Sequence, residues 1–193
     1  MLDNNKQPMF PIIETGRLWL RELALEDVDE LFSVLSDPEV IRFYDIPFIH
    51  QEQALRAIER HRFRFLQGAA VRWGITLKGE DRVIGNCGFS LDKDNHFAVL
   101  SYVLGKPYWG QGIMTEALRS IIRFGFDYYQ LHRFEADVAL PNVGSIRVLQ
   151  KLGFREEGLL RERLFTEGRY YDEMLLALLK TDFMGKIKKN NTL

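Results

Sequence analysis

Residues 97–117 of the chain read FAVLSYVLGKPYWGQGIMTEA, and this stretch decides the fold. Its first eight residues are mostly β-branched, aromatic or aliphatic, which is typical of a strand. Two glycines follow, Gly110 and Gly112, and apolar residues then recur at helical spacing from Ile113. A strand, a glycine turn and a helix in this order predict that backbone N–H groups converge at the turn, because glycine leaves no Cβ in their way.

A turn of this kind can bind an anion. The first N–H groups of a helix have no partner inside the helix, and the helix dipole adds about half a positive charge at that end. The sequence lacks the Lys and hydroxyl of a P-loop, and Thr115 stands where a dinucleotide-binding fingerprint has its third glycine. Nucleotide hydrolysis and dinucleotide redox chemistry are therefore disfavoured, and an ordinary tight turn stays the alternative on the glycines alone.

The rest of the chain predicts an α+β (mixed α/β) fold. Polar connectors separate residues 71–77, 82–91 and 97–104, so these three strands are expected to form an antiparallel meander. Strands and helices alternate only later in the chain, which favours a mixed sheet with helices on both faces. The other predicted strands are 17–21, 134–140 and 171–179, and the predicted helices are 26–35, 51–66, 113–125 and 142–152.

Length and composition indicate one domain, residues 1–193, with a core over about 12–180 and a frayed tail over 186–193. The formal net charge of −1 gives no general attraction to nucleic acid or to an anionic membrane. Arginines 56, 60, 62 and 64 form a basic stretch, but Glu52 and Glu59 are interleaved with them, so a solvated helix face is expected rather than direct nucleic-acid binding.

No run of residues approaches the roughly 20 apolar residues of a membrane span. The lone Cys87 lies in an apolar stretch and is expected to be a buried, unreactive thiol. The first eleven residues lack the apolar run of a signal peptide, so a cytoplasmic location is expected.

Two motifs resemble those of a known family. The segment from Ser101 to Ala117 resembles motif A of the GNAT superfamily of N-acetyltransferases. Asn142-x-x-Ser145, followed by the segment Lys151-Leu152-Gly153-Phe154 and by Glu157-Gly158, resembles the second signature of that superfamily at the expected spacing. With the opening segment from Glu14 to Arg21, the resemblance covers about residues 12–180. It points to the branch of the ribosomal-protein N-terminal acetyltransferases (RimJ/RimL-like).

This resemblance implies a mixed, mostly antiparallel sheet of six or seven strands. Its two central parallel strands, here 97–104 and 134–140, would splay apart so that the pantetheine arm of acetyl-coenzyme A enters between them. No residue is assigned to a metal. The resemblance implies contacts of the cofactor with Tyr102, Val103, Leu104, Gln111, Gly112, Ile113, Met114, Thr115, Asn142 and Ser145.

The resemblance also suggests catalytic residues. Ser145 lies one helical turn from Asn142, and it is expected to protonate or solvate the leaving thiolate; a helix-capping hydroxyl is the alternative. Glu135 is a candidate base, although alternation leaves its face of the sheet open. Two positions depart from the family pattern: Val99 stands where this branch often has Glu, and Met114 stands where a small residue is usual.

The predicted function is transfer of an acetyl group from acetyl-CoA to an amine by direct attack in a ternary complex, by a monomer or homodimer. A protein N-terminal α-amine of the ribosomal type is favoured, because it is already neutral in about a tenth or more of molecules near pH 7 and needs little help from a base. The alternatives are a small amine, such as a polyamine, an amino acid or an antibiotic, and a non-catalytic acyl-CoA-binding module. The acceptor pocket is assigned to Phe43, Tyr44, Phe48 and Trp73, with core packing as the other interpretation of Trp73.

Overall fold

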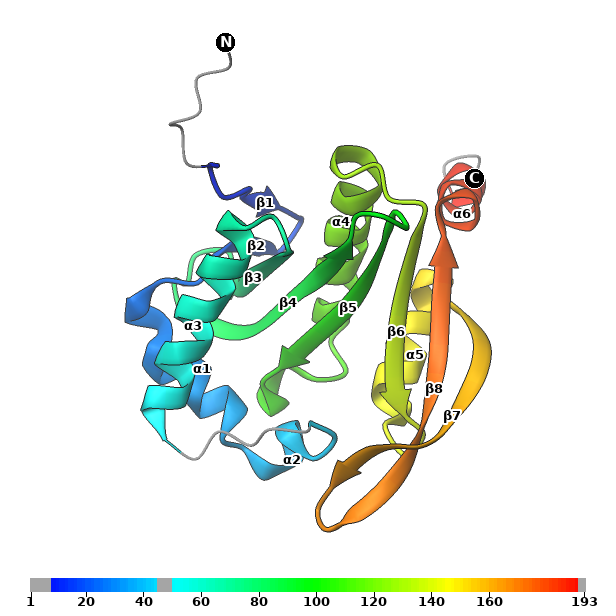
Figure 1. The fold of residues 1–193 in the computed structure, drawn as a ribbon. Coiled ribbons are helices and arrows are strands. Elements are labelled where there is room, and N and C mark those ends of the chain that lie inside the picture. The colour runs from blue at the N-terminus through cyan, green and yellow to red at the C-terminus, as the bar shows by residue number, and fades with distance from the viewer. Residues whose placement is uncertain (1–7, 45–49, 191–193) are drawn as a thin grey trace.

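The computed structural model describes residues 8–44 and 50–190, and it forms one eight-stranded mixed sheet (Figure 1). The strands lie in the order β1-β2-β3-β4-β5-β6-β8-β7. This arrangement confirms the predicted α+β fold class, with a sheet somewhat larger than expected. The strands are β1 (Ile13–Glu14), β2 (Leu18–Glu22), β3 (Ala70–Leu77), β4 (Val83–Asp92), β5 (Phe97–Leu104), β6 (Arg133–Ala139), β7 (Arg155–Thr166) and β8 (Arg169–Leu179).

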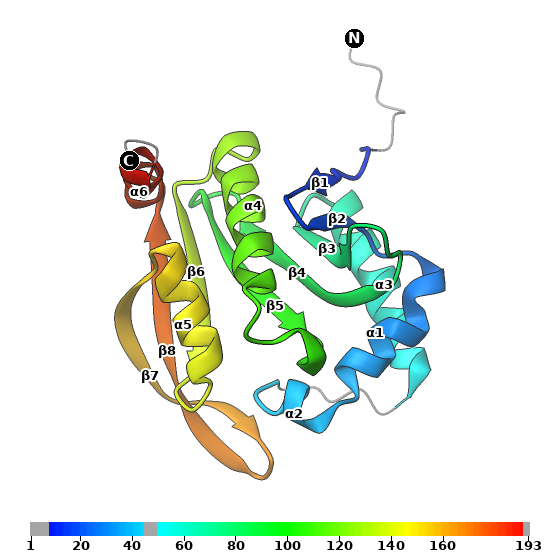
Figure 2. The same ribbon diagram turned by 180° about the vertical axis from the view of Figure 1, so that it is seen from behind.

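Helices cover both faces of the sheet, as predicted. Figures 1 and 2 show α1 and α3 on one face and α4 and α5 on the other. The α-helices are α1 (Val28–Leu35), α2 (Pro38–Ile41), α3 (Gln51–Leu66), α4 (Ile113–Tyr128), α5 (Val143–Leu152) and α6 (Lys180–Asn190), and two short 3₁₀ helices are η1 (Leu25–Asp27) and η2 (Lys106–Tyr108). Within the part of the chain that the structure describes, no helix is long and apolar enough to cross a membrane.

The two central strands splay apart. Strands β3, β4 and β5 form the predicted antiparallel meander, and β6 then lies parallel to β5. The parallel pairing lasts for three residues and ends where Val99 faces Glu135. The remaining residues of β5, through Leu104, have no partner in β6, so a gap opens between the strands toward their carboxyl ends. The expected splay is therefore confirmed.

Two apolar clusters hold the helices on the sheet. The larger one joins the sheet to α4 and α5 through fully buried side chains such as Trp73, Phe89 and Leu118. The smaller one joins the other face to α1 and α3 and includes Leu31 and Ile58. Alternation along each strand assigns its residues to one cluster or the other. The carboxyl end of β5 therefore lies between two layers, since Leu104 packs in the larger cluster and Val103 in the smaller one.

The sequence did not predict β1 or β7. Strand β7 extends to Thr166, and only the turn at Glu167 and Gly168 separates it from β8. The pairing of β7 with β8 shifts between Leu160 and Leu164, and Glu162 has a positive φ of 52°. This bulge breaks the period-two alternation, and β7 is an edge strand with mostly exposed side chains, so its sequence carries no clear strand pattern.

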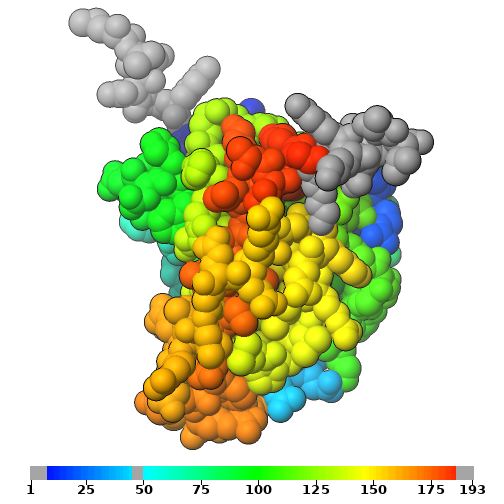
Figure 3. Space-filling model, turned by 90° about the vertical axis from the view of Figure 1, so that its right-hand side faces the viewer, coloured from blue at the N-terminus to red at the C-terminus, as the bar shows by residue number. Residues whose placement is uncertain are grey.

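Pro38 restarts a helix after α1, because it occupies the first turn of α2 and Asp37 caps that helix by accepting from the Glu39 N–H at 2.9 Å. Helix α6 continues to Asn190, so part of the tail that was expected to fray is helical. Figure 3 shows α6 above α5 and the β7–β8 hairpin on this side of the molecule. The single domain, the cytoplasmic location and the oligomeric state stay predictions.

Candidate active site

The glycine turn leaves an open helix end at the carboxyl end of β5. Gly110 and Gly112 both have positive φ, 74° and 75°, which favours glycine at these two places. The first backbone bond of α4 runs from the Glu116 N–H to the Gly112 carbonyl at 3.0 Å, and no side chain caps this end. The three N–H groups before Glu116 are therefore left for a ligand, as an anion-binding turn requires.

A cavity of about 620 Å³ lies at this turn. Strand β5, the turn, α4, α5 and the segment around α2 all line it. Nine of the ten residues that the sequence assigned to the cofactor line this one cavity; the exception is Gln111. Its basic lining residues are Arg42, Arg147 and Lys151, and Glu39 is the one carboxylate among its described lining residues.

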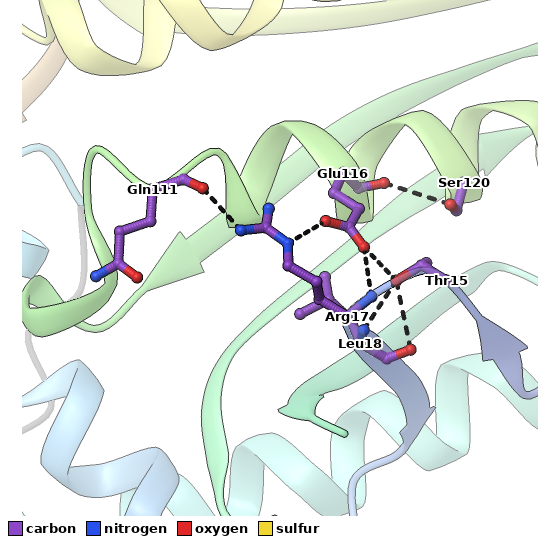
Figure 4. Close-up of polar contacts among 6 residues, drawn as sticks. All are labelled: Thr15, Arg17, Leu18, Gln111, Glu116 and Ser120. Atoms are coloured by element: carbon purple, nitrogen blue, oxygen red, sulfur yellow. Dashed lines mark hydrogen bonds and ion pairs between the residues drawn. The ribbon is translucent and has the colours of Figure 1, made fainter. Parts of the chain in front are cut away.

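Gln111 is held from outside the cavity by a cluster that the sequence did not reveal (Figure 4). Arg17 donates from Nη1 to the Gln111 carbonyl at 3.1 Å and from Nε to Glu116 Oε2 at 2.7 Å. The Thr15 hydroxyl and the Arg17 backbone N–H both donate to Glu116 Oε1, at 2.7 and 2.9 Å. The start of β2 is thereby tied to the turn and to the first turn of α4.

This cluster also changes the charge at the turn. A carboxylate in the first turn of α4 would repel a bound anion if it were free. Burial raises the pKa of the Glu116 carboxyl, but the hydrogen bonds from Thr15 and Arg17 and the charge of Arg17 outweigh it, so the pKa is lowered. Glu116 stays ionised and its charge is paired with Arg17, which leaves the helix end free for another anion.

A second cavity of about 630 Å³ adjoins the first and shares Gly112, Thr115 and Lys151 with it. It is lined by Arg17 and Arg119 in addition to Lys151. The two cavities together therefore present an elongated site in which basic groups surround the turn.

Met114 does not block the turn. Its side chain is 6% exposed and packs in the apolar cluster beneath α4. Trp109, in the same motif, donates from Nε1 to the Leu104 carbonyl at 2.7 Å and so fixes the turn on the end of β5. A long side chain at position 114 is thus compatible with close approach of a ligand to the backbone.

Asn142 and Ser145 are brought to the splay by α5. Asn142 is the N-cap of that helix, and its side chain accepts from the Ser145 N–H at 3.2 Å. The Ser145 hydroxyl lies 2.6 Å from the Tyr102 hydroxyl, and Tyr44 donates to the Tyr102 carbonyl at 2.5 Å. Burial raises the pKa of Tyr102 to about 12, in spite of the hydrogen bond with Ser145. A protonated tyrosine and a serine therefore share a hydrogen bond beside the gap.

The carboxylates of β6 lie on the other face of the sheet. Phe134, Ala136 and Val138 are buried, so Glu135 and Asp137 alternate to the opposite side. Glu135 is outside the cavity lining and accepts from Arg133 Nε at 2.7 Å. Partial desolvation raises the pKa of the Asp137 carboxyl, with Arg163 lowering it and Glu135 raising it. Sequence alternation alone could not fix this register.

The other predicted residues fall in several places. Phe43 and Tyr44 line the cavity, whereas Trp73 is fully buried and belongs to the core. Phe48 lies outside the described residues. Cys87 is fully buried, and burial raises its pKa to about 12, as expected of an unreactive thiol.

The sequence matches a known family over most of its length. Residues 17–155 match the family described as "Acetyltransferase (GNAT) domain". The chain is 41% identical over 173 residues to a Bacillus licheniformis protein named "Uncharacterized N-acetyltransferase p20", covering 89% of this chain and 97% of that one. It is 33% identical over 119 residues to the "[Ribosomal protein uS5]-alanine N-acetyltransferase" of Escherichia coli, covering 61% of each.

Solved structures share the fold. One of them is RimL, described as a ribosomal L7/L12 alpha-N-protein acetyltransferase in complex with coenzyme A. It aligns with a TM-score of 0.80 at 20% identity and covers 88% of this chain and 98% of the other. At this identity the likeness establishes the fold alone.

Proposed function

Since the chain belongs to the GNAT family of acetyltransferases and is an N-acetyltransferase with acetyl-CoA as its cosubstrate, we propose that it transfers the acetyl group to the α-amine at a protein N-terminus. The supporting observation is that the described residues lining the cavity include no unpaired carboxylate, and that Glu135, beside the splay on the opposite face of the sheet, is paired with Arg133. The one carboxylate among those lining residues, Glu39, is bound by Lys106. An acceptor amine that is almost fully protonated near pH 7 is thereby disfavoured.

Acetyl-CoA supplies a thioester that activates the acetyl group. The residues present fit this molecule, because an uncapped helix end, a strand gap and basic side chains occur together in one elongated site. The N–H groups of Ile113, Met114 and Thr115 would hold the pyrophosphate. The free edge of β5 would pair with the pantetheine amides, and Arg17, Arg119 and Lys151 would meet the 3′-phosphate.

The Tyr102–Ser145 pair would provide the proton for the leaving group. As the amine nitrogen bonds to the acetyl carbon, the carbon–sulfur bond breaks, the sulfur must gain a proton, and the nitrogen must lose one. The Ser145 hydroxyl is placed to donate the proton to the sulfur, and Tyr102 can replace that proton through the 2.6 Å hydrogen bond. The proton from the nitrogen passes to solvent, and solvent returns a proton to Tyr102 at the end of the cycle. The high pKa of Tyr102 keeps its proton available near neutral pH. Ser145 is the proposed proton donor. Glu135 is a weaker candidate for a base, because Arg133 pairs with it.

The α-amine fits this site for a physical reason. Its ordinary pKa of about 7.7 to 8 leaves a useful neutral fraction near pH 7, whereas a lysine amine with a pKa of about 10.4 is almost fully protonated. Val99, at the splay, offers no carboxylate to remove that proton. Partial likeness to the uS5-alanine acetyltransferase supports the same choice.

The proposal is tested by mass spectrometry on a panel of acceptors. The panel contains peptides that begin with Ala, Ser or Met, each with an acetyl-blocked counterpart, together with spermidine, lysine and an aminoglycoside. Acetylation of a free peptide but not of its blocked counterpart is the expected result. Product only on the small amines would contradict the proposal and assign the enzyme to metabolite or antibiotic acetylation.

A further inference from the structure

The side chain of Arg72 crosses the sheet to reach the strand that splays. In β3, Val71 and Trp73 are buried in the cluster beneath α4, so Arg72 points to the opposite face. Arg72 pairs with Gly88 in β4, and Gly88 pairs with Ser101 in β5. Because Gly88 has no side chain, nothing separates Arg72 from Ser101 in this row.

Three hydrogen bonds fix the guanidinium. Nη1 donates to Asn86 Oδ1 at 2.8 Å and to the Ser101 carbonyl at 3.3 Å, and Nη2 donates to the Ser101 hydroxyl. A guanidinium has five N–H donors, so one at Nε and one at Nη2 are left. These two point in parallel along one edge of the group, which is the geometry that matches the two oxygens of a carboxylate.

The remaining edge has no partner in the described part of the chain. Nε of Arg72 has no hydrogen-bond partner in residues 8–44 and 50–190, yet no buried side-chain nitrogen or oxygen in those residues lacks a partner. Nε therefore keeps some contact with solvent although most of the Arg72 side chain is covered. The edge is not occupied by a protein group of the described residues.

No carboxylate balances the charge of Arg72 in the described part of the chain. Arg21 is paired with Asp27 at 2.7 Å, and Arg133 is paired with two glutamates. Burial lowers the pKa of the Arg72 guanidinium; Tyr44 and Cys87 oppose this shift, and the neighbouring Arg64 and Arg60 add to it. A desolvated cation without a counter-charge is costly to the fold, and such groups are common at functional sites.

The position of this cation relates it to the acceptor. Ser101 directly precedes Tyr102, whose hydroxyl contacts Ser145 at the proposed site of acetyl transfer. Arg72 lies on the face of the sheet opposite α5. An acceptor bound by Arg72 would therefore reach the thioester from the side opposite to the cofactor. Val99, on the same face, is 38% exposed, so solvent reaches this face at the residue where the splay begins.

We propose that the free edge of the Arg72 guanidinium binds a carboxylate of the acceptor, so that the preferred acceptors are amines with a carboxylate close to the reacting nitrogen. This inference rests on the proposed N-terminal acetylation, in which an acidic side chain in the first residues of a peptide supplies the group. A free amino acid supplies the same chemistry from its own α-carboxylate.

The test compares matched acceptors with the wild-type enzyme. The pairs are peptides that begin Ala-Asp and Ala-Asn, peptides that begin Ala-Glu and Ala-Gln, and free alanine with alaninamide. In the pair whose carboxylate reaches Arg72, the acidic acceptor is expected to have a kcat/KM roughly 10-fold to 100-fold higher than its amide counterpart. This is the range for a hydrogen bond to a charged group. This comparison needs no variant, so it stands even if substitution of Arg72 impairs folding.

Variants then assign the preference to Arg72. Arg72→Gln is expected to abolish the preference, and Arg72→Lys to retain only part of it, because lysine keeps the charge but lacks the paired donors. Arg62→Gln is the matched control, since it removes the same charge from a side chain that is 65% exposed on the neighbouring helix α3. Circular dichroism and CoA affinity are measured for each variant to verify its fold.

The outcomes separate this inference from the proposed function. Equal kcat/KM within both peptide pairs, or an unchanged preference in Arg72→Gln, would overturn the inference and leave N-terminal acetylation standing. Acetylation of alanine without alaninamide or any peptide would overturn the proposed function and support the carboxylate site. Acetylation of none of these acceptors would contradict both.

Discussion

His61 should make the protein sensitive to acid, and the size of the effect follows from its surroundings. The side chain lies on α3 near Arg72. Burial lowers its pKa to about 3 from the ordinary value of 6.5, and the charges of Arg72, Arg60 and Arg64 add to this shift. The folded protein therefore keeps His61 neutral, whereas the unfolded chain takes up a proton below pH 6.5.

The sign and magnitude follow by linkage. Because the unfolded state binds more protons between the two pKa values, the contribution of His61 to the free energy of unfolding is constant above about pH 6.5 and falls as the pH drops toward 3. At pH 5 the unfolded pKa lies about 1.5 units above the pH, and each unit is worth about 1.4 kcal/mol, so His61 should cost about 2 kcal/mol. This figure depends mainly on the unfolded pKa, since the folded one is well below 5.

The assay is urea unfolding at pH 7 and pH 5, followed by tryptophan fluorescence, for which the buried Trp73 is a suitable reporter. Wild type should lose about 2 kcal/mol more than His61→Gln between these two values. His132→Gln, at an exposed histidine, is the matched control and should behave as wild type. Equal losses in wild type and His61→Gln would refute the assignment of a half-buried, neutral His61 beside three arginines.

Three further predictions concern the site. Arg17→Gln should weaken CoA binding about five-fold in calorimetry, because it leaves the Glu116 carboxylate unpaired beside the anion-binding turn; an unchanged affinity would contradict this role. Tyr102→Phe and Ser145→Ala should each lower kcat by about 100-fold, and the double variant should be little worse than either single one, since the two hydroxyls act as a unit. Additive losses in that cycle would speak against a shared proton path. Cys87, with its pKa raised to about 12 by burial, should resist thiol reagents until the protein unfolds, and rapid labelling of the native protein would be inconsistent with its environment.

The sequence predicted those parts of the site that local patterns carry. Two glycines and a helical pattern after a strand identified the turn, and Asn142 with Ser145 three residues later identified the start of α5. Each of these signals depends on residues within a few positions of one another. The structure accordingly places nearly all of the assigned cofactor residues around one cavity.

Contacts between distant segments were not predictable in the same way. Arg17 and Glu116 are 99 residues apart, and Tyr102 and Ser145 are 43 apart, so no spacing pattern joins them. The reach of Arg72 to Ser101 depends on the register of three strands, which alternation alone leaves open. The bulge in β7 hid that strand for a related reason, because an extra residue erases the period of two.

The central claim is that the enzyme acetylates the α-amine and not a side-chain amine, and one measurement tests it most directly. A peptide with a free N-terminal alanine, an acidic second residue and one internal lysine is incubated with the enzyme and acetyl-CoA, and tandem mass spectrometry locates the added acetyl group. The account predicts acetyl on the α-amine alone, at a rate that depends on Ser145. Acetyl on the lysine side chain, with the α-amine left free, would contradict it.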